Sequence, residues 1–131
     1  MFRKELRDKL IKIFGIPKTT YDDPSESYEQ DTLFISMSDA KPRITSGVLT
    51  CEVKGTLTIY CQKEKLHYGF FSRAIERASM FTGRFFFSNI DTDIENSGAR
   101  MNNIHEIRCN FIYLYEGKFD PAKGELTSVE F

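Results

Sequence analysis

The strongest pattern in this chain is a strict alternation of apolar and polar side chains between Leu49 and Gln62. The odd positions carry apolar residues or glycine, and the even positions between them carry polar or amphipathic residues. Because successive side chains of a strand point to opposite faces, the alternation predicts one long, half-buried antiparallel strand over residues 48–62. Such a strand would span roughly 50 Å, whereas a compact domain of this length is roughly 36 Å across. We therefore expect an element that reaches past its own body toward other molecules.

Lys54-Gly55 is a competing turn signal inside this strand. A two-residue loop there would shift the phase and place Leu57 on the polar side, so the alternation favours a continuous strand. A three-residue loop over residues 54–56 would keep the phase, with Gly55 supplying a positive φ, and this alternative stays open.

The other elements follow from periodicity and from glycine and proline punctuation. An apolar stripe at spacings of three and four predicts a helix over residues 2–14, which Gly15 ends. A second stripe, made of Phe71, Ala74, Ile75 and Ala78, predicts a helix over residues 64–81. We expect strands at residues 32–37, 84–90 and 104–116, a hairpin tip within 38–47, surface loops at 17–31 and 91–103, and a C-terminal tail at 117–131 with a turn at Asp120-Pro121 and a short strand near its end.

This order predicts a single α+β domain of 131 residues, an antiparallel β-sheet with a long β-hairpin and two helices packed on one face. The predicted strand 104–116 places Ile107, Cys109 and Phe111 on one face and Ile112 and Leu114 on the other. One layer of helices covers only one face. The second face must meet the tail, the N-terminal helix or another subunit, and large apolar patches favour a subunit.

Composition narrows the class of protein. The formal net charge is -1, from 18 basic and 19 acidic residues, whereas a dedicated duplex-binding protein is usually clearly basic. No stretch approaches the length of a membrane span, and the charged N-terminus does not resemble a signal peptide. The three cysteines, Cys51, Cys61 and Cys109, all fall on the apolar phase of predicted strands, so we expect buried free thiols in a reducing compartment.

Catalytic and metal-binding patterns are weak. The two histidines, His67 and His105, have no partner at zinc-ligand spacing, and no nucleophile motif is present, so we expect no catalytic or metal site and no cofactor. The acidic alternation at residues 91–95 lacks the glycine and glutamate of a calcium loop. The segment 83–87, Gly-Arg-Phe-Phe-Phe, is similar to the aromatic strand of an RNA-recognition module, but we interpret it as a core strand because such modules begin with a strand rather than a helix.

A set of cationic and apolar side chains on the long hairpin, the 91–103 loop and the last strand marks a candidate contact between subunits or with a passing polyanion such as DNA. Charges at the rim of an interface set its register and association rate. The candidates are Lys41, Arg43, Lys54, Arg100, Ile112 and Leu114.

The size, the element order of residues 2–116 and the ending Phe-Ile-Tyr-Leu-Tyr at 111–115, followed by Gly-Lys-Phe-Asp-Pro at 117–121, together give a family resemblance. The chain resembles the tail terminator (tail completion) proteins of tailed bacteriophages, the family of the lambda-type minor tail protein U. The resemblance does not extend to the loop 17–31 or the tail 117–131.

The resemblance implies a non-enzymatic virion protein, assembled in the host cytoplasm, that forms a homohexameric ring. Such a ring ends the tail tube, contributes to the head–tail junction and contacts the tube and the head-completion or connector proteins. DNA would only pass through its lumen, and no membrane or small-molecule substrate is implied. A tail tube or connector subunit remains an alternative, as does a monomeric α+β module that binds nucleic acid or peptide.

Overall fold

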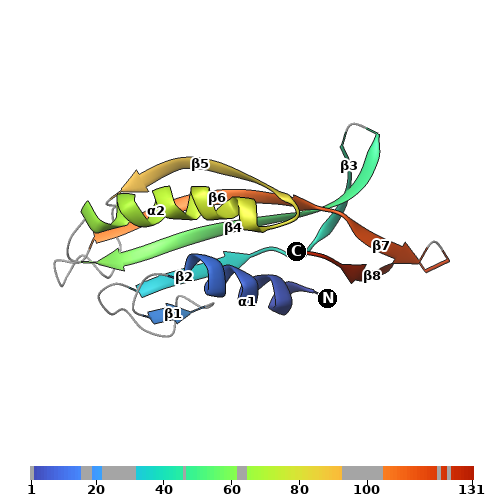
Figure 1. Cartoon of the computed structure of the whole chain (residues 1–131), viewed down its shortest axis with the longest axis horizontal. Helices are drawn as coiled ribbons and strands as arrows, with labels where there is room; N and C mark the ends of the chain where they lie inside the picture. The colour runs from blue at the N-terminus through green and yellow to red at the C-terminus, as the bar shows by residue number, and fades with distance from the viewer. Residues whose placement is uncertain are drawn as a thin grey trace.

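The computed structural model describes residues 2–15, 19–21, 32–45, 47–61, 65–92, 105–120, 122–123 and 125–131. Its elements lie in two layers, a sheet and a layer of helices (Figure 1). The helices are α1 (Arg3–Phe14), α2 (Lys65–Arg77) and the short 3-10 helix η1 (Ala78–Met80). The strands are β1 (Thr19–Tyr21), β2 (Thr32–Met37), β3 (Lys41–Thr45), β4 (Val48–Cys61), β5 (Arg84–Thr92), β6 (His105–Tyr115), β7 (Gly117–Asp120) and β8 (Glu125–Val129).

The predicted α+β class is confirmed, and β4 is the spine of the sheet. The strand order is β1-β2-β4-β6-β5. β2 and β3 lie end to end along one edge of β4, and β6 pairs with its other edge, all antiparallel. The predicted hairpin is therefore present, with its tip between Thr45 and Val48.

β4 runs without a turn through Lys54 and Gly55, so both turn alternatives at this position are wrong. Gly55 has a different role. A Cβ added to it would lie 2.2 Å from the ring of Phe111 on β6 and 2.8 Å from the carbonyl oxygen of Ser36 on β2. The glycine therefore lets the Phe111 ring lie directly against the backbone of β4, and it is a packing requirement rather than a loop signal.

Three segments differ from the predictions. The expected loop 17–31 contains β1, which pairs with β2 in parallel, so the sheet is not wholly antiparallel. The expected tail is a second hairpin, β7 with β8, and the sequence prediction of a strand only near its end missed β7. β5 also continues to Thr92, two residues into the predicted 91–103 loop.

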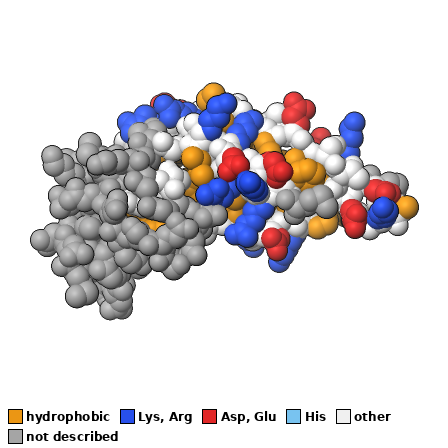
Figure 2. Space-filling model, turned by 90° about the horizontal axis from the view of Figure 1, so that it is seen from below, with side chains coloured by type: hydrophobic (Ala, Val, Ile, Leu, Met, Phe, Trp, Pro, Cys, Tyr) orange, Lys and Arg blue, Asp and Glu red, His pale blue; other side chains and the backbone are white. Residues whose placement is uncertain are grey.

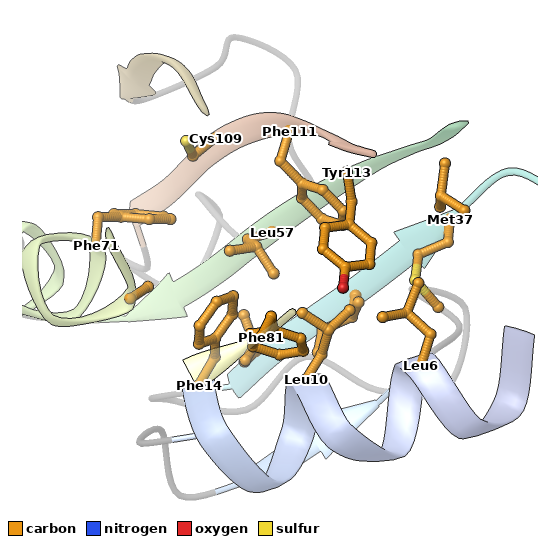
Figure 3. Close-up of a cluster of buried hydrophobic side chains, with 14 of the residues drawn as sticks. Leu6, Leu10, Phe14, Met37, Leu57, Phe71, Phe81, Cys109, Phe111 and Tyr113 are labelled. Atoms are coloured by element: carbon orange, nitrogen blue, oxygen red, sulfur yellow. The ribbon is translucent and has the colours of Figure 1, made fainter. Parts of the chain in front are cut away.

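The core lies between the helices and one face of the sheet. Leu6, Leu10 and Phe14 of α1 meet the odd-numbered residues of β4 and β6, with Phe71 of α2 beside them (Figure 3). Tyr113 is fully buried, and its hydroxyl accepts a hydrogen bond from the Gly83 amide at 3.2 Å. Ile75 departs from the predicted stripe of α2, because it is 53% exposed.

The C-terminal residues close the helical side of the molecule. The ring of Phe131 packs on Tyr115 with centroids 5.1 Å apart, and Leu126 and Val129 also contact the core. The backbone oxygen of Phe131 accepts hydrogen bonds from the Thr82 amide and from Lys9 Nζ. Two of the three candidates for covering the second sheet face, the N-terminal helix and the apolar residues of the tail, therefore pack on the helical face instead.

Candidate subunit interface

A hairpin arm extends from the body of the molecule (Figure 1). We use "arm" for β3 and the first part of β4, residues 41–45 and 47–52. A two-residue connection joins its strands, and Gly47 there has φ +78°, a conformation that favours glycine. β6 ends at Tyr115, opposite Cys51, so among the described residues only β3 pairs with Val48–Thr50.

The end of the arm is apolar and exposed. We call Ile44, Val48 and Leu49 the tip; these side chains are 75%, 47% and 48% exposed. Ile44 pairs directly with Leu49. Leu49 has the same strand phase as the buried residues Cys51 and Val53, so the apolar face of β4 continues beyond the core that it serves.

Charged side chains flank the arm on the opposite phase. Arg43 and Glu52 form an ion pair at 2.7 Å, and Lys54 lies 4.0 Å from the same carboxylate. Lys41 is exposed and has no ion pair within the part of the chain that the structure describes. The arm therefore combines an apolar end with a solvated basic flank.

The same phase continues across the sheet on the face opposite the helices, which we call the outer face. Lys54 of β4 is the register partner of Ile112, which in turn pairs with Phe86 of β5. Glu52 likewise aligns with Leu114. Phe86 is 51% exposed, a large value for an aromatic side chain on a sheet.

Two adjoining hollows on this face share Phe86, and we call them together the outer groove. One, of about 610 Å³, crosses the strands at Lys54, Ile112 and Phe86. The other, of about 550 Å³, lies beside the arm and is lined by Val48 and Thr50 of the arm and by Leu114, Glu116 and Glu130, among others. The outer groove is thus apolar in its middle and acidic at the end near the arm.

Five of the six candidates chosen from the sequence fall on one continuous surface. Lys41 and Arg43 lie on the arm, and Lys54, Ile112 and Leu114 lie on the outer face beside it. Arg100 lies outside the described residues.

Sequence reasoning missed the tip and Phe86 as candidates. The available signal for the tip was the length of the alternation, which begins at Leu49, one residue after Val48. A strand that pairs with so long an element had to end somewhere along it and leave the rest exposed. The sequence contained no signal for the exposure of Phe86, because a strand cannot be assigned to the edge of a sheet before the strand order is known.

The structure adds little about the histidines, the cysteines and the two segments that the sequence had singled out for possible chemistry. The side chains of His67, His105 and Cys61, and residues 93–95, lie outside what the structure describes. Cys51 and Cys109 are buried free thiols, as predicted, and burial raises the pKa of both. Of the three phenylalanines in the segment 83–87, Phe85 and Phe87 pack against the core and only Phe86 is strongly exposed.

Figure 2 shows acidic and basic side chains interspersed over the described part of the lower side of the molecule. No described group of three or more His, Cys, Asp or Glu residues could hold a metal ion, and no described helix could cross a membrane. No protein-family model matches the chain, and no curated protein matches its sequence.

Proposed function

We propose that this protein is a non-enzymatic, ring-forming subunit of a bacteriophage tail, which ends the tail tube and contributes to the head–tail junction. The observation that carries the proposal is the arm, a strand that outruns its sheet and exposes Ile44, Val48 and Leu49 at its end. Leaving three large apolar side chains in water is unfavourable by about 25 cal/mol per Å², so such a tip is best explained by a protein surface that covers it.

The state of the other strand edges supports this view. Sheet edges that must stay unpaired are usually protected by prolines, charges or bulges. β3 carries Pro42 between Lys41 and Arg43, and β5 has a bulge between Phe87 and Ile90. The segment Val48–Thr50 has none of these features, so this edge of the arm is both apolar and unprotected.

The proposal includes the rest of the family expectation: a homohexameric ring in the virion, contacts with tail tube and head-completion proteins, and DNA that only passes through the lumen. A contact between different surfaces of neighbouring copies closes a ring without leaving free ends. A tail tube or connector subunit would use the same kind of contact.

Electron microscopy and native mass spectrometry of the purified protein over a concentration series test the proposal. Single closed rings are the expected result. Open-ended tubes would favour a tube subunit instead. A protein that stays monomeric throughout the series, and that binds DNA or RNA with an affinity that falls as salt rises, would be a nucleic-acid-binding module.

A further inference from the structure

We propose that the tip of one copy docks into the outer groove of the next copy, head to tail. This inference rests on the proposed ring-forming function and names the two surfaces that would meet. The inserted side chains are Ile44 and Leu49, because Val48 itself lines the arm end of the outer groove. The receiving apolar residues are Phe86, Ile112 and Leu114.

A tip cannot reach the wider part of the outer groove of its own molecule. Leu49 and Gly55 are six residues apart along β4, which is roughly 20 Å at the rise of a strand. Of the intervening residues, Thr50–Glu52 pair with β3 and Cys51–Lys54 pair with β6, so this part of β4 is held in the sheet. The occupant must therefore come from a second molecule, and the contact joins two different patches, as ring closure requires.

Charge favours a second copy of this chain as the occupant. At the arm end of the outer groove, Glu116 and Glu130 outnumber Arg84, which leaves one net negative charge. On the arm, Lys41 and Arg43 outnumber Glu52, which leaves one net positive charge.

These groups are free to pair across a contact. Within the described residues, Lys41, Glu116 and Glu130 form no ion pair. Lys54, the cation in the middle of the outer groove, is instead held by Glu52 at 4.0 Å. An apolar tip on an arm that carries Lys41 at its root therefore fits an apolar groove that ends in two carboxylates.

The contact is small, and its size determines how stable isolated pairs and closed rings should be. A standard stable interface buries about 800 Å² per partner, more than a few side chains at a hairpin tip can supply. Each copy in a ring makes the contact twice, once with its arm and once with its groove. We therefore expect isolated pairs to be weak and closed rings to be stable.

Complementary variants test the docking. The tip variant carries Ile44→Asp and Leu49→Asp, and the groove variant carries Phe86→Asp and Ile112→Asp. A matched control, Ile75→Asp, changes a side chain on α2 with similar exposure, 53%. Circular dichroism and urea unfolding establish that each variant is folded, and native mass spectrometry measures assembly.

Each of the two variants alone should lose assembly, with a dissociation constant raised about tenfold or more, while the control assembles like the wild type. An equimolar mixture should form weak 1:1 complexes at high concentration and nothing larger, because one partner keeps an intact groove and the other an intact tip. A mixture that behaves as the two variants do separately over the whole concentration series, including its highest concentration, overturns the docking.

A charge exchange gives an independent measurement if the groove variant does not fold. Lys41→Glu should weaken assembly, and combining it with Glu116→Lys and Glu130→Lys should restore it. Failure of this rescue, with each variant folded, overturns the pairing of these surfaces.

The outcomes separate this inference from the proposed function. Rings that form normally from the tip and groove variants would refute the docking and leave the ring function intact. Open tubes that are lost in both variants would support the docking and refute the terminator role. A wild-type protein that never assembles refutes both.

Discussion

At the scale of single residues, Gly55 shows how close packing can be mistaken for a turn. Its neighbours leave no space for a side chain, since a Cβ would lie 2.2 Å from the Phe111 ring. We expect Gly55→Ala to destabilise the fold by about 1–3 kcal/mol, because the ring must move from its place in the core. Urea unfolding of the monomer measures this loss.

The matched double variant Gly55→Ala with Phe111→Leu should recover part of the lost stability, because leucine is smaller where the new methyl group needs space. The free energies of the two single changes should then add to more than that of the double variant. Strict additivity would show that the Phe111 ring is not what excludes a side chain at position 55.

Four buried acids, Cys51, Cys109, Tyr113 and Tyr115, predict how stability depends on pH. Burial is the largest cause in each case, and it raises the pKa of all four above ordinary values of 9.0 for the thiols and 10.0 for the phenols. Above pH 9.0 the unfolded chain therefore loses protons before the folded chain does. The contribution of these groups to the free energy of unfolding should be fully present below that pH and should be lost as pH rises further.

Chemical denaturation at a series of pH values measures this decline. Tyr115→Phe should make the decline shallower, because it removes one of the four groups. Stability that stays constant as pH rises through 9.0 and 10.0 would contradict the burial of these groups.

At the scale of elements, the sequence predicted those with a long period and missed those without one. The alternation of β4 and β6 and the stripe of α1 extend over many residues, so their type and phase could be predicted. β1 has three residues, too few for a period, and it forms only because β2 offers a free edge. Ile75 matched the helical pattern, yet it is 53% exposed, so the pattern alone did not identify which of its members pack in the core.

The candidate surface was predictable in part for the same reason. Strand phase alone placed Lys54, Ile112 and Leu114 on one face. The exposed tip depends on where β6 stops, opposite Cys51, which is a property of the whole sheet and not of the segment around Leu49.

Amide hydrogen exchange should divide β4 into two parts. Gly55–Tyr60 lie between β2 and β6, so their amides should exchange slowest in the protein. Val48–Thr50 have a partner on one side only and should exchange fast at concentrations where the protein is monomeric. They should become protected where it assembles, while Gly55–Tyr60 do not change. Protection of Val48–Thr50 that is independent of concentration would mean that assembly does not cover the arm.

At the scale of the whole molecule, the proposed docking means that every copy inserts its arm into one neighbour and accepts the arm of another in its outer groove. A copy with the tip variant can receive an arm but cannot give one, so it interrupts any ring that it enters. When tip variant and wild type are mixed, the fraction of closed rings should fall as the wild-type fraction raised to the number of subunits in the ring. A logarithmic plot of ring yield against wild-type fraction, measured by native mass spectrometry, therefore gives that number as its slope. Dilution with the Ile75→Asp control should leave the yield unchanged, because Ile75 is an exposed side chain of α2 that belongs neither to the tip nor to the lining of the outer groove. A yield that falls only in proportion to the wild-type fraction would mean that each copy contributes independently, which a closed head-to-tail ring does not allow.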